Sequence, residues 1–282
     1  MIKIIECPRD AMQGIKEFIP TPTKTAYLNQ LLQVGFDTLD FGSFVSPKAI
    51  PQMRDTAEVL AGLDLSHTRT RLLAIVANRR GAEDAVAFPE ISYLGYPFSI
   101  SETFQQRNTN ASIEESLERV EEIQNLCISS GKQLVLYISM GFGNPYGDPW
   151  NVDIVQRWVA RLTGMGIGIF QLSDTIGVAG PDSIRYLFSH LIPAYPQVEI
   201  GAHLHTHPAT WREKTAAAYE SGCRRFDGAI MGFGGCPMAK DDLTGNMPTE
   251  KMMAYLAEQE SLGLNMKALA EAMRMAPSVF PL

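Results

Sequence analysis

The feature that most limits what this chain can fold into is a run of alternating histidines, His203, His205 and His207, ended by Pro208. Neighbours on one helix face lie three or four positions apart, whereas positions i and i+2 of a strand point to the same side. The alternating apolar residues of 198–202 predict such a strand. It would bring two imidazoles to one point, as a metal site requires. The pair could be His203 with His205 or His205 with His207, and strand geometry alone does not choose between them.

Short apolar runs alternate with longer helical patterns along the chain. Predicted strands cover 2–7, 38–41, 72–77, 96–100, 134–139, 167–172, 198–205 and 225–230. Predicted helices cover 23–34, 46–60, 81–88, 113–130, 152–163, 182–191, 210–221, 249–262 and 266–274, and we expect a loop over 8–22. These alternations favour an α/β chain that forms one (β/α)8 TIM barrel over residues 1–282, with extra C-terminal helices from about residue 249 packed on it. A doubly wound open sheet is the alternative, but no GxGxxG follows the first predicted strand.

Charge and cysteine use narrow the range of partners. The formal net charge is −7 and Lys and Arg form no stripe, which argues against nucleic acid. No apolar run approaches the roughly 20 residues of a membrane span, and the early charges do not fit a signal peptide. The four cysteines lack a CxxC pair, as expected of free thiols in a reducing compartment, and we assign Cys7, Cys127 and Cys223 to packing. We therefore expect a cytoplasmic protein without a membrane partner.

Polar residues gather where the predicted strands end, which in a TIM barrel is where the active site lies. They come from segments far apart in the sequence, yet one barrel mouth would bring them together. They are Arg9 and Asp10 after the first strand, Asp40 in the second, Asp174 after the sixth, His203 and His205 in the seventh, and Cys236 and Asn246 after the eighth.

The residue types indicate the chemistry of this mouth. Two imidazoles, a carboxylate and an amide oxygen suit a divalent cation such as Mg²⁺ or Mn²⁺, with Zn²⁺ as a further option. A cation in such an open site acts as a Lewis acid, and Arg9 offers a fixed positive charge for an enolate oxygen. Cys236, in a glycine-rich loop, suits proton transfer. Asp10 and Asp174 also fit helix N-caps, and Cys236 also fits a passive loop residue.

Five motifs together resemble 3-hydroxy-3-methylglutaryl-CoA lyase, a member of the metal-dependent TIM-barrel lyases and condensing enzymes. The likeness covers about residues 4–264. The motifs are Arg9-Asp10 with Gln13, Ser43-Phe44-Val45-Ser46-Pro47-Lys48, Ser173-Asp174-Thr175-Ile176-Gly177, His203-x-His205, and Gly234-Gly235-Cys236-Pro237 with Gly245-Asn246.

The resemblance implies retro-Claisen cleavage of an acyl-CoA to acetoacetate and acetyl-CoA. It implies a divalent cation held by Asp10, His203, His205 and Asn246, which selects His203 as the partner of His205. It further implies catalytic roles for Arg9, Asp40, Asp174, His203 and Cys236. Arg9 would stabilise the enolate of acetyl-CoA and Cys236 would move a proton. We also expect a homo-oligomer, with a dimer favoured.

The chain departs from the family pattern at four places. Asp40 stands where the family has glutamate, so we expect its contact with Arg9 to be lost or bridged by water. Thr206-His207-Pro208 replaces the Asp-Thr that usually follows the second histidine, and Asn144 replaces a common cysteine. The loop between Cys236 and Asn246 has one extra residue. An aldolase or Claisen condensing enzyme on the same scaffold, a metal-dependent hydrolase, and a metal-stabilised scaffold without turnover are the alternatives.

Overall fold

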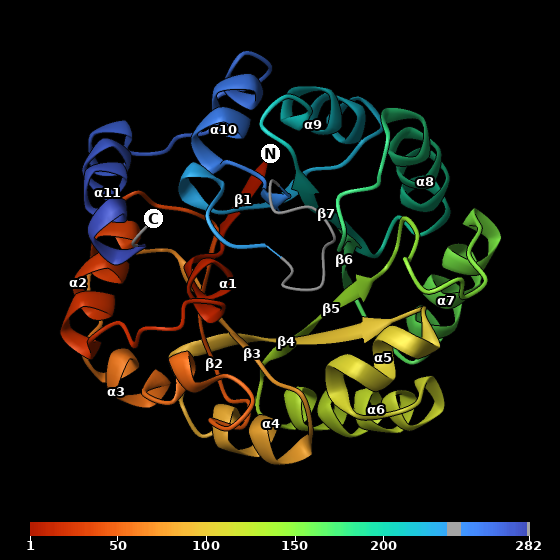
Figure 1. Cartoon of the computed structure of the whole chain (residues 1–282), viewed down its shortest axis with the longest axis horizontal. Helices are drawn as coiled ribbons and strands as arrows, with labels where there is room; N and C mark the ends of the chain where they lie inside the picture. The colour runs from red at the N-terminus through yellow and green to blue at the C-terminus, as the bar shows by residue number, and fades with distance from the viewer. Residues whose placement is uncertain (236–243, 281–282) are drawn as a thin grey trace.

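The strands of the chain close into a barrel of eight parallel strands (Figure 1). The computed structural model describes residues 1–235 and 244–280. The strands are β1 Lys3–Glu6, β2 Thr38–Ser43, β3 Arg71–Ile75, β4 Ile91–Ser99, β5 Gln133–Ser139, β6 Ile169–Asp174, β7 Glu199–Thr206 and β8 Arg225–Gly228. Each pairs with the next in parallel, and β8 pairs in turn with β1, with Lys3 opposite Arg225 and Glu6 opposite Gly228. This closure confirms the predicted (β/α)8 TIM barrel.

The helices form a ring around the outside of the barrel, except α1, which lies within this ring near the barrel mouth (Figure 1). They are α1 Pro8–Gln13, α2 Thr21–Leu32, α3 Thr56–Ala61, α4 Arg79–Val86, α5 Glu102–Thr109, α6 Ile113–Ser129, α7 Val152–Gly164, α8 Pro181–Ala194, α9 Trp211–Glu220, α10 Thr249–Ala257 and α11 Met266–Val279, with the 3-10 turns η1 Pro51–Met53 and η2 Ile230–Gly232. Among the described residues, none of these helices combines the length and the apolar run that crossing a bilayer requires.

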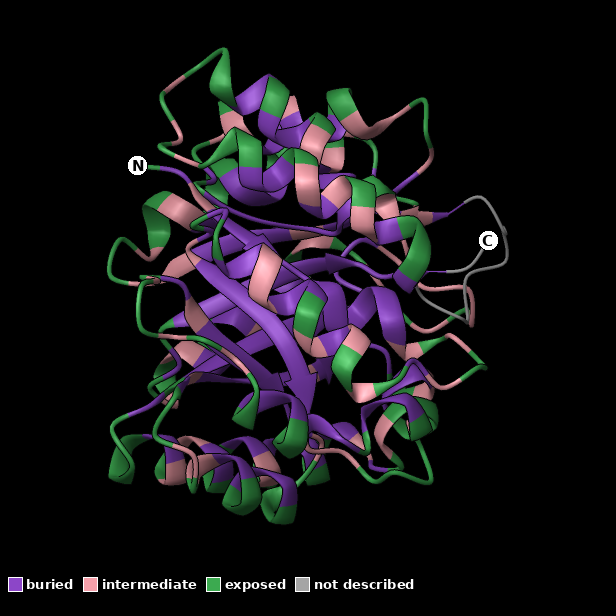
Figure 2. Ribbon diagram, turned by 90° about the vertical axis from the view of Figure 1, so that its left-hand side faces the viewer, coloured by how far each residue is buried: buried purple, intermediate pink, exposed green. Residues whose placement is uncertain are grey.

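The apolar interior has two parts. The larger lies between the outside of the barrel and the helices, and Figure 2 shows the strands as a buried layer under half-exposed helices. The smaller fills the inside of the barrel and includes Leu73, Tyr93, Val135 and Tyr137. Branched apolar side chains commonly fill such a core. Here Gln171, Arg225 and Asp227 are buried on strands of the same barrel, so part of its interior is polar.

The predictions were wrong mainly in short elements. Residues 8–22 contain the six-residue helix α1, in which Pro8 occupies the first turn, where a missing N–H costs no helical bond. Helix α5 was not predicted, although Ser101 caps it by accepting a hydrogen bond from the Phe104 N–H. Strand β4 begins at Ile91, earlier than predicted. Pro97 fits because β4 pairs with β3 only as far as Gly95. The predicted helix 46–60 is divided into η1 and α3.

The segment after β8 returns to the mouth of the barrel. The two-residue strand β9, Gly245–Asn246, pairs antiparallel with the end of β7, which puts Asn246 directly opposite His205. Helix α10 then packs against α9, and α11 packs against α2. The chain thus passes from the barrel mouth back to the outer layer of helices.

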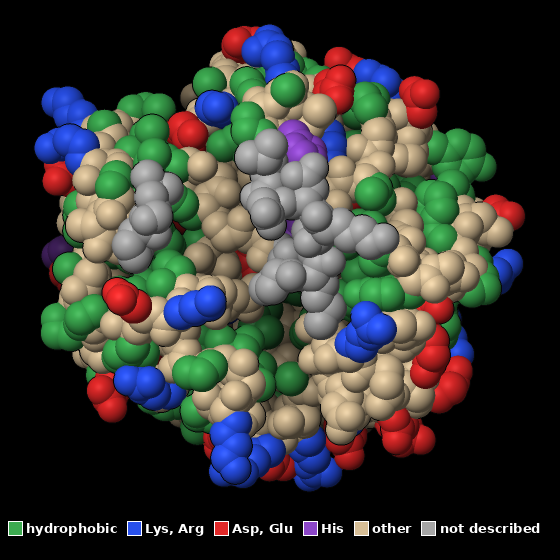
Figure 3. All heavy atoms as spheres, viewed as in Figure 1, with side chains coloured by type: hydrophobic (Ala, Val, Ile, Leu, Met, Phe, Trp, Pro, Cys, Tyr) green, Lys and Arg blue, Asp and Glu red, His purple; other side chains and the backbone are tan. Residues whose placement is uncertain are grey.

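Around the face shown in Figure 3, acidic and basic side chains alternate and neither sign forms a broad patch.

Candidate active site

Three buried side chains converge at the C-terminal end of the barrel. Asp10 comes from the first turn of α1, and His203 and His205 come from the end of β7. Each offers one ligand atom, and these atoms lie within 4.8 Å of one another. The i, i+2 spacing on β7 turns both imidazoles to the same side, as the alternation of a strand requires. Of the donor sets found in the described residues, this is the one that matches the predicted metal site.

The two imidazoles have different partners on their inner sides. His205 Nδ1 lies 2.8 Å from the carbonyl oxygen of Thr175, and His205 Nε2 is buried without a hydrogen-bond partner among the described residues. His203 Nδ1 lies 3.0 Å from Oδ2 of Asp227. Burial lowers the pKa of His203, but its hydrogen bond to Asp227 and the charges of Asp227 and Asp10 together outweigh burial, so the pKa is raised. Burial and the neighbouring His203 charge lower the pKa of His205.

The carboxylate of Asp10 is held by three donors. Nη1 of Arg9 approaches it at 3.2 Å, Nε2 of Gln13 at 2.5 Å and Nδ2 of Asn246 at 2.7 Å. Asn246 Nδ2 also donates to the carbonyl of Phe233 at 2.9 Å, so the amide oxygen of Asn246 is the atom that remains to coordinate a metal ion. Burial raises the pKa of Asp10, but the charges of Arg9 and the two histidines and the hydrogen bond from Asn246 together outweigh burial, so the pKa is lowered. Asp10 is therefore an ionised carboxylate at neutral pH, as metal binding requires.

The expected loss of contact between Asp40 and Arg9 was wrong. Nε of Arg9 lies 3.0 Å and Nη2 lies 2.6 Å from Oδ2 of Asp40, a direct two-pronged ion pair. The shorter carboxylate reaches because α1 starts directly after β1 and packs against β2, the strand that carries Asp40. Burial lowers the pKa of Arg9, but Asp40 and Asp10 outweigh it and the pKa is raised. Arg9 is thus a fixed, fully charged guanidinium at the edge of the metal cluster.

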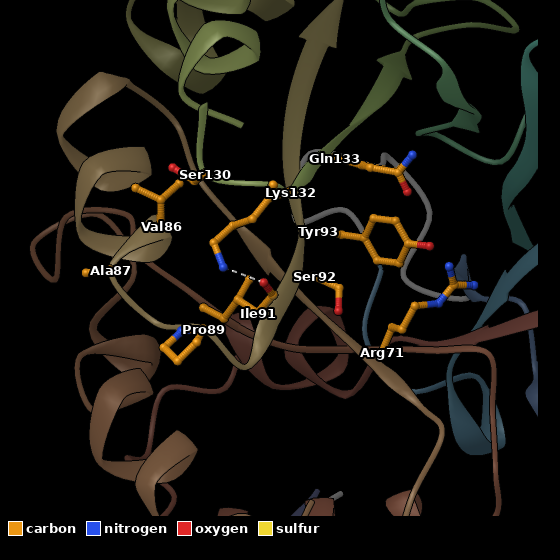
Figure 4. A pocket seen from close by; sticks show the side chains of 11 residues that line it. Arg71, Val86, Ala87, Pro89, Ile91, Ser92, Tyr93, Ser130, Lys132 and Gln133 are labelled. Atoms are coloured by element: carbon orange, nitrogen blue, oxygen red, sulfur yellow. Dashed lines mark hydrogen bonds between the residues drawn. The ribbon is translucent and has the colours of Figure 1, made fainter. Parts of the chain in front are cut away.

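A cavity of about 340 Å³ opens above this cluster at the C-terminal ends of the strands. Its walls mix apolar side chains with polar ones, a composition typical of small-molecule sites. They include Arg9, Asp10, Val45, Tyr137, Ser139 and His203. A larger hollow of about 570 Å³ lies at the N-terminal ends of β3, β4 and β5. There Lys132 turns back to the carbonyl of Ile91 (Figure 4), and none of the metal-ligand sets found in the described residues lies in it. The chemistry therefore points to the smaller cavity.

Asp174 does not join the metal cluster. Its Oδ2 accepts a hydrogen bond from Lys214 Nζ at 2.7 Å and one from the Ala179 N–H at 3.1 Å, while its Oδ1 is buried without a partner in the described residues. Lys214 also donates to the carbonyl of His205 at 2.8 Å. Asp174 and Lys214 therefore tie the end of β6 to the backbone that carries His205.

The remaining sequence candidates divide into three groups. Cys236 and most of the loop that follows it lie outside the described residues. His207, past the end of β7, is not part of the metal cluster, and its Nε2 lies 3.3 Å from Thr244 Oγ1. Asn144 forms a turn, in which Oδ1 accepts from the Tyr146 N–H at 3.0 Å and Nδ2 donates to the Asp148 carbonyl at 2.9 Å. Asn144 thus has a structural role where cysteine is common in the family.

Sequence reasoning missed Asp227, the partner of His203. The available signal was the pair Arg225 and Asp227, two charged residues at i and i+2 inside a predicted strand. Such a pair on one side of a barrel strand has to face either solvent or a polar interior, and both residues are in fact buried. Lys214 carried no comparable signal, because lysine in a helix usually faces solvent.

Comparisons with known proteins agree on one family. The family model described as HMGL-like matches residues 2–276. The mitochondrial hydroxymethylglutaryl-CoA lyase of Bos taurus is 33% identical over 275 residues, which cover 96% of this chain and 83% of the relative. The HMG-CoA lyase structure from Bacillus subtilis has a TM-score of 0.90 at 32% identity and covers 98% of this chain and 93% of its own. An HMG-CoA lyase from Acenitobacter baumannii, solved with coenzyme A and 3-methylmalate, has a TM-score of 0.90 at 30% identity. The match covers 99% of this chain and 91% of that one.

Proposed function

Because this chain belongs to the HMGL-like family, we propose that it is a carbon–carbon lyase that cleaves 3-hydroxy-3-methylglutaryl-CoA, or a close analogue, to acetoacetate and acetyl-CoA. The observation that carries the proposal is the meeting of Asp10, His203 and His205 beside a fixed guanidinium in one cavity. The relatives named as HMG-CoA lyases at about one-third identity over nearly the whole chain support the choice of substrate.

The donor set fits a divalent cation. His205 Nε2 is a buried nitrogen without a partner among the described residues, and such atoms are costly unless something binds them. We propose Asp10, His203, His205 and Asn246 as the ligands, and Mg²⁺ or Mn²⁺ as the ion, because one carboxylate, two imidazoles and an amide oxygen suit both. When bound, the cation supplies Lewis-acid polarisation of substrate oxygens.

For this reaction the protein has to hold charged groups in position and to transfer protons. The C3 hydroxyl loses its proton, the C2–C3 bond breaks, and its electrons pass into the thioester as an enolate, which then takes a proton at C2. The negative charge moves to the thioester oxygen, where a fixed cation is most useful. Arg9 spends its Nε and one Nη2 proton on Asp40 and its Nη1 protons on Asp10 and Gln13, which leaves one Nη2 proton for the substrate. Asp40 thereby orients Arg9.

The remaining roles rest on the family resemblance. We propose Cys236 as the group that moves a proton at C2 and Asp174 as a residue needed for turnover. The contacts of Asp174 favour an indirect action, because its carboxylate is buried against Lys214. We also propose a homodimer, which sedimentation would test. Cys7, Cys127 and Cys223 are free and buried, which is consistent with a proposed cytoplasmic location.

The test is direct. The protein is incubated with 3-hydroxy-3-methylglutaryl-CoA and Mg²⁺ or Mn²⁺, and acetoacetate is measured. We expect metal-dependent release that Asp10→Asn abolishes, whereas Asp84→Asn, an exposed carboxylate on α4, leaves it unchanged. Turnover of 2-oxoacid aldols without acetoacetate formation would favour the aldolase alternative, and turnover of simple esters or amides would favour a hydrolase. Either result would overturn the proposal.

A further inference from the structure

The two histidines of the cluster are each fixed from behind by an acceptor. A backbone carbonyl and an ionised carboxylate can only accept hydrogen bonds, so a ring nitrogen that faces one must carry the proton. His205 Nδ1 faces the Thr175 carbonyl at 2.8 Å and His203 Nδ1 faces Asp227 Oδ2 at 3.0 Å. In both rings the proton therefore belongs on Nδ1, and the lone pair belongs on Nε2.

We propose that Asp227 is a positioning residue for the cation site: its carboxylate keeps the proton of His203 on Nδ1 and directs Nε2 toward Asp10 and His205. The inference rests on the proposed function, since it concerns the same site. Outer partners of metal-bound histidines set ring orientation and raise ligand basicity. His205 has only a neutral carbonyl for this purpose, so His203 is the imidazole whose ligand strength depends on a charged neighbour.

Asp227 is itself held on its other side. Gln171 Nε2 donates to Oδ1 of Asp227, which leaves Oδ2 for His203. Asp227 is 3% exposed and Gln171 is fully buried, so neither can exchange this contact for bulk water. Two bonds at opposite oxygens leave the carboxylate no freedom to rotate away from the imidazole.

The barrel interior also supplies the charge that a buried carboxylate needs. Arg225 lies two residues before Asp227 on β8 and is 1% exposed. Its Nη1 reaches Glu199 at 3.2 Å, and its charge also attracts that of Asp227. From the other side the ring of Tyr137 meets the ring of His203 edge-on, with 5.5 Å between their centres. Polar side chains and an aromatic ring thus surround the His203 imidazole, at a place in the barrel interior that apolar side chains usually fill.

A rival interpretation of the same atoms uses Cys7. Its sulfur, His203 and Asp227 also bring one ligand atom each within 4.8 Å of one another, so they could form a separate metal set. However, Nδ1 of His203 is already bonded to Asp227, and the bond from Cys7 Sγ goes to the Ile5 carbonyl at 3.9 Å. Cys7 is therefore a matched control, because its sulfur lies within 4.8 Å of the ligand atoms of His203 and Asp227 but bonds to the Ile5 carbonyl instead of the imidazole.

The test has one arm without metal and one with Mn²⁺. Nitrogen NMR of the metal-free protein, at a pH where the imidazoles are neutral, should show His203 with a protonated Nδ1 and an unprotonated Nε2. Calorimetric titration with Mn²⁺ should show about 10- to 100-fold weaker binding in Asp227→Asn. We expect Cys7→Ser to bind Mn²⁺ as the wild type does. Gln171→Met removes only the hydrogen bond from Gln171 to Asp227, so its Mn²⁺ affinity should lie between those of Asp227→Asn and Cys7→Ser. This variant replaces Asp227→Asn if Asp227→Asn does not fold.

The outcomes separate the two proposals. An unprotonated Nδ1 in the wild type, wild-type Mn²⁺ affinity in folded Asp227→Asn, or an equal loss in Cys7→Ser would each overturn the role of Asp227. A wild-type protein that binds no Mn²⁺ would instead overturn the cation site of the proposed function. In that case the tautomer measurement, made without metal, still decides whether Asp227 orients His203.

Discussion

The ion pair between Arg9 and Asp40 allows a prediction with a magnitude. Asp40 is fully buried and accepts contacts from Arg9 at 2.6, 3.0 and 3.2 Å. Asp40→Asn removes the negative charge but keeps one acceptor oxygen, so the guanidinium stays buried with a weakened partner. Breaking a buried pair in this way costs about 3–5 kcal/mol. We expect the free energy of unfolding in urea to fall by about 3 kcal/mol.

Activity should fall as well, and a second buried pair provides the control. A misplacement of about 1 Å can cost about 100-fold in rate, so we expect kcat for acetoacetate release to fall by about that factor in Asp40→Asn. Asp55 accepts a 2.7 Å bond from buried Lys24, away from the cluster. Asp55→Asn should lose similar stability and keep kcat. Wild-type stability in Asp40→Asn, or an equal loss of kcat in Asp55→Asn, would refute the reasoning.

Three further predictions concern other buried contacts. Burial raises the pKa of Glu6 from 4.5 to about 8, so the folded state keeps a proton that the unfolded state loses. As the pH rises from 4.5 to about 8, the free energy of unfolding should therefore fall by up to about 1.4 kcal/mol per pH unit. Glu6→Gln should remove this pH dependence in urea titrations. Gly201→Ala would place Cβ 1.9 Å from Gln171 Oε1 and should cost about 1–3 kcal/mol in thermal unfolding, whereas Gly168→Ala, with open space, should cost little. Lys214→Met leaves a buried carboxylate without its cation and should cost about 3–5 kcal/mol in urea; unchanged stability would contradict it.

The barrel could be predicted because its signal is spread over the whole chain. Each strand is a short apolar run followed by a helical pattern, so small errors in boundaries do not change the topology. The errors fell where local rules are weakest. Six residues of α1 are too few for a periodic signal, and Pro8 suggested a loop although it fits the first turn of a helix.

The site was only partly predictable for a different reason. The metal cluster comes from strand ends, and barrel geometry alone says that such ends meet. The partners behind it depend on which side of a strand or helix is buried, and on reach. Asp227 meets His203 from the neighbouring strand β8, and Lys214 reaches Asp174 and the backbone of His205 from helix α9. Local sequence patterns do not encode such contacts between elements. The reach of Asp40 to Arg9 likewise depends on how α1 leaves β1.

The most direct test of the whole account is a crystal structure of the protein soaked with Mn²⁺, with diffraction data collected at the manganese absorption edge. The account predicts one anomalous peak at the barrel mouth, within bonding distance of Asp10, of His203 Nε2 and of His205 Nε2. A peak beside Cys7 and Asp227 instead, or no peak in the barrel at saturating Mn²⁺, would contradict it.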